Sequence, residues 1–184
     1  MSTATAMNTA TEESYGKLVA PRTIEIQRLL PGPIERIWDY LTKSDLRRQW
    51  LASGDMELKT GTTCELVWHH DETTKPPGAR PDGVNPESHL PSRITVCEPP
   101  HKLGFMFWSD SEVLFELKPA GNRVLLTLTH KNLPSRGMMV GVSTGWHTHL
   151  DVLAARVSDT KIENFWDHWR GYKAEYEKRI PASA

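Results

Sequence analysis

The 184-residue sequence lacks closely spaced cysteines. Its two cysteines, Cys64 and Cys97, lie far apart, without the Cys-x-x-Cys spacing that zinc and redox sites usually show. A chain of this length can bury roughly 70% of the surface that its unfolded form exposes, so it needs neither a disulfide nor a metal to fold. We therefore expect two reduced thiols, no metal site and no cofactor.

An excess of charge of one sign is also missing. The 22 Lys and Arg residues nearly cancel the 23 Asp and Glu residues, leaving a formal net charge of -1 at pH 7. Such a chain has no net field that would attract nucleic acid or an anionic membrane surface. The composition therefore predicts no nucleic-acid partner.

Long apolar runs are absent as well, because no segment reaches the 18 or more apolar residues of a membrane helix. The opening MSTATAMNTATEES has neither the apolar core of a secretory signal nor the arginines of a transit peptide. We interpret residues 1–20 as a disordered N-terminal tail and expect a soluble, cytoplasmic protein without a membrane span.

What the sequence does contain is a series of short strand patterns. Residues 23–30 show period-two alternation, and similar patterns recur at 63–69, 93–98, 102–108, 112–118 and 123–130. The later strands are joined by short turn-like segments, which predicts an antiparallel meander. Residues 70–89, rich in Pro and Gly, are predicted to form a long loop.

Helical patterns interrupt and follow the strands. A short amphipathic helix is predicted after Pro33, and a second, which Ser44 can cap, is predicted to begin at Asp45, with Arg47 facing outward. After a Gly/Met linker, Ser143 or Thr144 is expected to cap a long helix. We predict a domain over residues 21–158. Aromatic residues at helical spacing predict an extension, residues 159–184, that packs on the domain or on a partner subunit.

Four segments taken in order resemble a known family. They are LLPGPIERIWDYLTKSDLRRQWL, EPPHKLGFMFW, VLFELKPAGNRVLLTLTHKNLP and STGWHTHLDVLAARV. They resemble the START-like (SRPBCC) superfamily, in its branch similar to the heat-shock-protein-90 ATPase activator homology domain. The resemblance implies an α+β helix-grip fold, in which a curved antiparallel sheet wraps a long C-terminal helix. Members of the superfamily bind lipids, hormones or polyketides, and some act as aromatase/cyclases.

We predict a ligand cavity between the sheet and the long helix. Apolar cavities with a few polar groups are the usual small-molecule sites, and alternation turns part of each strand toward the helix. The residues predicted to bind the ligand are Trp146, His130, Phe115, Leu126, Leu128, Phe105, Phe107, His149, Leu150 and Leu153. No nucleophile elbow, phosphate loop or catalytic triad pattern is visible.

The histidines do not form a metal-ligand pattern. His147 and His149 are two residues apart, which places them on different faces of a helix, and His69 and His70 point to opposite sides of a strand. His130 shares a face with the apolar residues of its strand. It is either a hydrogen-bonded residue at the sheet rim or a cavity group that orients a ligand or exchanges protons.

Our first hypothesis is therefore a protein, monomeric or homodimeric, that binds a hydrophobic small molecule: a lipid, an aromatic compound or a polyketide-like compound. Two alternatives remain. One is an enzyme of cyclase or dehydratase type that uses His130 as acid or base. The other is an interaction protein similar to the chaperone-ATPase activators.

Overall fold

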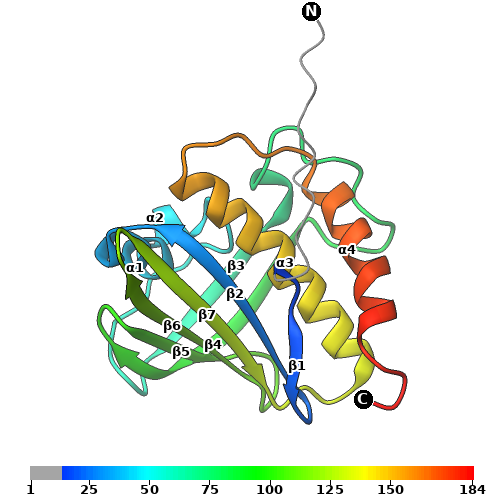
Figure 1. The fold of residues 1–184 in the computed structure, drawn as a ribbon, viewed down its shortest axis with the longest axis horizontal. Coiled ribbons are helices and arrows are strands. Elements are labelled where there is room, and N and C mark those ends of the chain that lie inside the picture. Colours follow the sequence, from blue (N-terminus) through cyan, green and yellow to red (C-terminus); the bar gives the residue numbers. More distant parts are fainter. Residues whose placement is uncertain (1–13) are drawn as a thin grey trace, which may run out of the picture.

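The computed structural model describes residues 14–184, so most of the predicted tail lies outside the described residues. Seven strands form one antiparallel sheet in the order β1-β2-β7-β6-β5-β4-β3. Their bounds are β1 Lys17–Ala20, β2 Thr23–Pro31, β3 Thr63–His69, β4 Glu87–Glu98, β5 Lys102–Met106, β6 Glu112–Ala120 and β7 Arg123–Lys131. The sheet is curved and open, as the resemblance implied (Figure 1).

Helices cover the inner side of this sheet. The short helices α1 (Ile34–Thr42) and α2 (Ser44–Arg47) follow β2, and a single 3-10 turn, η2 (His70–Glu72), follows β3. The long helix α3 (Arg136–Val157) runs along the inside of the curve, and α4 (Phe165–Arg179) packs on α3 (Figure 1). The predicted α+β helix-grip fold is confirmed.

Alternation places the apolar core between the sheet and α3. On β6, Val113, Phe115 and Leu117 are buried, and on β7 the inward positions run from Val124 to His130. Directly paired positions such as Phe115 and Leu128 therefore stack side by side on the inner face.

The long helix begins earlier than the sequence predicted. Its N-cap is Ser135, whose Oγ accepts a hydrogen bond from the backbone N–H of Met138 at 3.2 Å. The predicted cap at Ser143 or Thr144 was wrong, because both residues lie inside the helix. Each glycine disfavours a helix by about 1 kcal/mol, so the glycine-containing segment before Ser143 was predicted to be a linker. The cap at Ser135 and the packing on the sheet outweigh that cost.

The other boundary corrections concern the edges of the sheet. Residues 17–20, assigned to the tail, pair with β2 as edge strand β1. β4 starts at Glu87, so the loop after η2 is shorter than predicted, and β5 ends before Phe107.

Arg47 is buried, although the helical pattern placed it outside. Its guanidinium donates to the backbone carbonyls of Leu41, Thr42 and Ala52, and burial lowers the pKa of Arg47 to about 10. The side chain thus satisfies the carbonyls left free where α1 ends, a demand that helical periodicity does not register.

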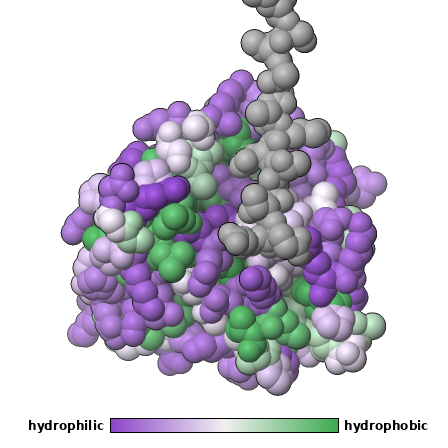
Figure 2. Space-filling model, in the orientation of Figure 1, coloured by the Kyte–Doolittle hydropathy of each residue, from purple (hydrophilic) through white to green (hydrophobic). Residues whose placement is uncertain are grey.

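The face shown in Figure 2 is mostly hydrophilic, with a few separate apolar patches. Exposed large apolar side chains include Leu18, Val19, Leu29, Leu58 and Trp108. Within residues 14–184, no helix combines the length and the apolar character needed to cross a membrane.

Candidate ligand-binding cavity

A cavity of about 270 Å³ lies between the first half of α3 and the end of the sheet formed by β3 and β4. Its walls come from α3, from β3, η2 and β4, and from the turn after β5. The lining residues are Leu51, Trp68, His70, Ser88, His89, Phe107, Trp108, Met138, Gly141, Val142, Gly145, Trp146 and His149. None of these is a Lys, Arg, Asp or Glu, so the walls carry no permanent charge.

The helix contributes a single stripe to this cavity. Its lining positions run from Met138 to His149 at spacings of three and four residues, which places them on one face of α3. Gly141 and Gly145 lie within the stripe, and a Cβ atom added to either would meet nothing within 4 Å. The absence of two side chains therefore leaves the space open.

Aromatic rings form most of the remaining wall. Phe107 is central, with its ring centroid 5.9 Å from Trp68, 5.8 Å from Trp146 and 4.6 Å from Trp108. Trp108 belongs to the turn between β5 and β6 and is 48% exposed, so it forms the outer rim. An apolar ligand would meet ring faces and edges from the sheet side and the helix side.

Trp146 is held in place by a histidine behind it. Its indole N–H donates a hydrogen bond to Nδ1 of His130 at 3.1 Å, so the proton of His130 is on Nε2. His130 is completely buried, and burial lowers its pKa to about 4. At neutral pH His130 is therefore an uncharged acceptor that fixes the orientation of the Trp146 ring.

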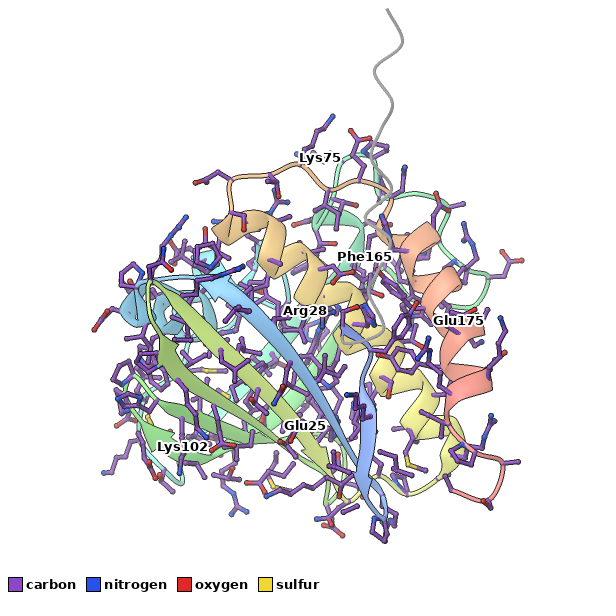
Figure 3. The ribbon with its side chains drawn as sticks, in the orientation of Figure 1. Glu25, Arg28, Lys75, Lys102, Phe165 and Glu175 are labelled. Carbon is purple, nitrogen blue, oxygen red and sulfur yellow. The ribbon has the colours of Figure 1, made fainter. Side chains whose placement is uncertain are left out.

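The polar end of the cavity consists of two more histidines. The rings of His70 and His149 lie 5.3 Å apart, and Nδ1 of His149 is 2.6 Å from the backbone carbonyl oxygen of Trp50. Phe165 lies at the start of α4 (Figure 3), and its ring centroid is 5.7 Å from that of His70 and 5.0 Å from that of His149. Burial lowers the pKa of His70 to about 4 and that of His149 to about 3. Both are uncharged at neutral pH.

The family model described as Activator of Hsp90 ATPase homolog 1-like protein matches residues 31–158, a stretch that contains every residue lining the cavity. The chain belongs to this family.

Solved structures share the fold of this chain. A Bordetella parapertussis protein solved by solution NMR is 34% identical, with a TM-score of 0.74 over 91% of each chain. CalU16 from Micromonospora echinospora is 20% identical, with a TM-score of 0.64 over 91% of this chain and 96% of its own. DynU16, described as a protein in the dynemicin biosynthetic locus, is 15% identical, with a TM-score of 0.59 over 74% of this chain and 47% of its own. A search of curated proteins found no match.

Three of the predicted ligand-binding residues line the cavity of this Hsp90-activator-like domain: Phe107, Trp146 and His149. The other seven are buried in the core next to it: Phe105, Phe115, Leu126, Leu128, His130, Leu150 and Leu153. Phe115, for example, lies 5.7 Å from the Trp146 ring. Direct ligand contact stays a prediction for all ten, and the geometry favours the first three.

Sequence reasoning missed the glycines and the rim. Gly141 and Met138 were assigned to a linker, and Gly145 to the start of the helix without a role in the cavity, although the three fall on the helical stripe of Val142, Trp146 and His149. Extending the 3.6-residue period N-terminally from Trp146 would have revealed them.

His147 belongs to a separate cluster between α3 and α4. The Tyr176 hydroxyl accepts a hydrogen bond from the Gly16 N–H at 2.7 Å and is also hydrogen-bonded to Nδ1 of His147 at 2.9 Å. Burial, with Arg28 and other nearby cations, lowers the pKa of His147 to about 2. Its Nε2 is 3.8 Å from Oδ2 of Asp151. This contact is not an ion pair, because the imidazole is neutral.

Two further features of the family domain bear on function. In the described part of the chain, no three His, Cys, Asp or Glu side chains are grouped so that they could hold a metal ion. A second depression, beside α1 and α2, has charged groups of both signs, including Asp39, Lys43, Asp45 and Arg48. Its wall carries permanent charges, which the aromatic cavity lacks, so the aromatic cavity is the better candidate site for an apolar ligand.

Proposed function

We propose that the protein binds a hydrophobic small molecule, a lipid-like, aromatic or polyketide-like compound, in the cavity beside α3. The observation that carries this proposal is a 270 Å³ space walled by four aromatic rings and by no permanently charged side chain. An apolar ligand that buries about 200 Å² there would gain about 5 kcal/mol from the area removed from water. DynU16, the fold relative from a biosynthetic locus, is consistent with such a ligand.

The two alternatives receive less support. An acid/base role for His130 would require substrate access, but its ring is fully buried behind Trp146 and Phe107. An interaction with a chaperone ATPase stays a prediction that rests on the family description. Homodimer formation and a cytoplasmic location likewise stay predictions.

The proposal can be tested with prodan, an uncharged naphthalene dye. We expect saturable one-to-one binding with a blue-shifted emission. In ¹H–¹⁵N spectra, the shifts should concentrate on the amides of Gly141 and Gly145 and on the Trp146 indole. Native mass spectrometry of protein purified from its own host should show a retained small molecule. Non-saturable binding, or shifts confined to the exposed apolar residues of β1, would contradict a cavity ligand.

A further inference from the structure

The hydrogen bond of His149 determines what this residue can offer a ligand. A backbone carbonyl can only accept, so Nδ1 of His149 must donate its proton to the oxygen of Trp50 at 2.6 Å. In the neutral imidazole, Nε2 is then an acceptor. No hydrogen bond to Nε2 is found among the described residues, and the side chain is only 4% exposed. This Nε2 is not among the described side-chain atoms that are buried without a partner, so it is accessible from the cavity that His149 lines, where a ligand donor can pair with it.

His70 supplies the complementary group. Its Nδ1 is buried and has no hydrogen-bond partner in residues 14–184. An orphaned N–H is rarer in proteins than an orphaned acceptor, so the proton of the neutral ring belongs on Nε2. His70 then offers a donor, and His149 an acceptor, from rings whose centroids are 5.3 Å apart.

The charges around this pair exclude some ligands. None of the cavity walls carries a Lys or Arg that could neutralise an anion. The hydrogen bonds of His89, the remaining lining histidine, to Glu87 and Glu65 raise its pKa, but these two carboxylates already balance any positive charge on its ring. A carboxylate in the cavity would lose its hydration without gaining a counter-charge.

From this geometry we infer that the cavity selects an uncharged ligand carrying a hydroxyl group, which donates to Nε2 of His149 and accepts from His70. This inference rests on the proposed function and narrows its ligand class, because a hydroxyl both donates and accepts one hydrogen bond. Simple hydrocarbons leave both imidazoles unpaired, and carboxylates bring an uncompensated charge.

Three naphthalenes that differ in one substituent test this selection in the intact protein. 2-Naphthol has the hydroxyl, 2-methoxynaphthalene keeps the oxygen but cannot donate, and 2-naphthoate is an anion at pH 7. We expect 2-naphthol to bind about fivefold more tightly than the methyl ether, the ratio of about one hydrogen bond. The naphthoate should bind at least about tenfold more weakly than 2-naphthol.

Two substitutions at His149 separate hydrogen bonding from shape. In His149→Asn, the amide N–H can still donate to Trp50, but no atom remains at the Nε2 position. In His149→Gln, the amide oxygen can reach the Nε2 position. The preference for 2-naphthol over its ether should fall to about onefold in the Asn variant and persist in the Gln variant. If the preference for 2-naphthol depended on shape alone, it would change by the same factor in both variants.

The results distinguish selection for a hydroxyl group from hydrophobic binding in the cavity. If wild-type protein binds naphthol and ether equally, or binds the naphthoate best, hydroxyl selection is refuted while a hydrophobic site remains. If prodan and the two neutral naphthalenes all fail to bind, the cavity proposal fails and takes this inference with it. The wild-type comparison requires no variant to fold.

Discussion

A leucine at Gly145 should close the cavity without damaging the fold. Gly145 lies in the middle of α3 on the cavity stripe, and a Cβ atom there would meet no neighbour within 4 Å. A leucine side chain occupies roughly 100 Å³ at protein packing density, more than a third of the 270 Å³ available. Leucine is also a better helix former than glycine by about 0.8 kcal/mol.

We therefore expect Gly145→Leu to raise the melting temperature by about 2–3 °C while weakening prodan binding at least tenfold. Gly171→Leu provides the matched control. Gly171 is an exposed residue of α4 whose added Cβ also meets nothing within 4 Å, and it lies away from the cavity lining. This variant should show the same stability gain with unchanged binding.

Thermal unfolding followed by circular dichroism, together with dye titration, measures both effects. Prodan binding to Gly145→Leu with wild-type affinity would refute the placement of the ligand beside α3. A large loss of stability in Gly145→Leu alone would show that the space is already filled by the protein.

Three further outcomes follow from the buried histidines. The unfolded chain protonates near pH 6.5, whereas folded His70, His130, His147 and His149 resist protonation to about pH 4 or below. Acid therefore favours unfolding, and urea denaturation should show stability falling by up to about 1.4 kcal/mol per histidine per pH unit between pH 6.5 and 4; a flat profile would contradict this. Trp146→Phe leaves the buried Nδ1 of His130 without its donor and should cost about 1–3 kcal/mol, with most of the loss relieved by adding His130→Leu. Tyr176→Phe removes the acceptor of the Gly16 amide, whose hydrogen exchange should accelerate; unchanged exchange would mean that water replaces the hydroxyl.

The sheet could be predicted from the sequence because alternation is a local signal. Each strand fixes its own inner face, so the buried positions of β6 and β7, from Val113 to His130, follow directly from period two. The resemblance supplied the curved sheet that wraps a long inner helix, which alternation alone does not determine. This arrangement agrees with the structure.

The site was harder to predict, because a cavity is defined by missing side chains. Period two shows that Phe115, Leu126 and Leu128 point inward, but not whether they meet a ligand or each other. In the structure they fill the middle of the core. The open volume lies beside another part of α3, where Gly141 and Gly145 have no side chains to fill the space between the helix and the sheet. The predicted site consisted of bulky residues and did not include the small residues that create the space.

The interaction of His130 and Trp146 shows the same limit. The sequence placed them on facing elements and predicted opposite walls of one chamber. Their side chains meet directly, with a 3.1 Å hydrogen bond. The period of a strand or helix shows which face a residue lies on, but not how far along the helix axis it lies relative to a residue of the strand. That relative position determines whether the two side chains touch or stand apart across a cavity.

The polar end of the cavity depends on a segment outside the family match. Phe165, which packs on the rings of His70 and His149, follows residue 158, where the match ends. The same turn of α4 holds the chain just after η2: the Phe165 N–H donates to Thr74 Oγ1 at 3.1 Å and the Trp166 N–H to the carbonyl of Pro77 at 3.0 Å. His149 is carried by α3 and anchored to Trp50, and His70 directly follows β3. The family domain thus provides the cavity and both imidazoles, whereas the C-terminal extension provides the aromatic ring that packs on the two groups that would recognise a hydroxyl.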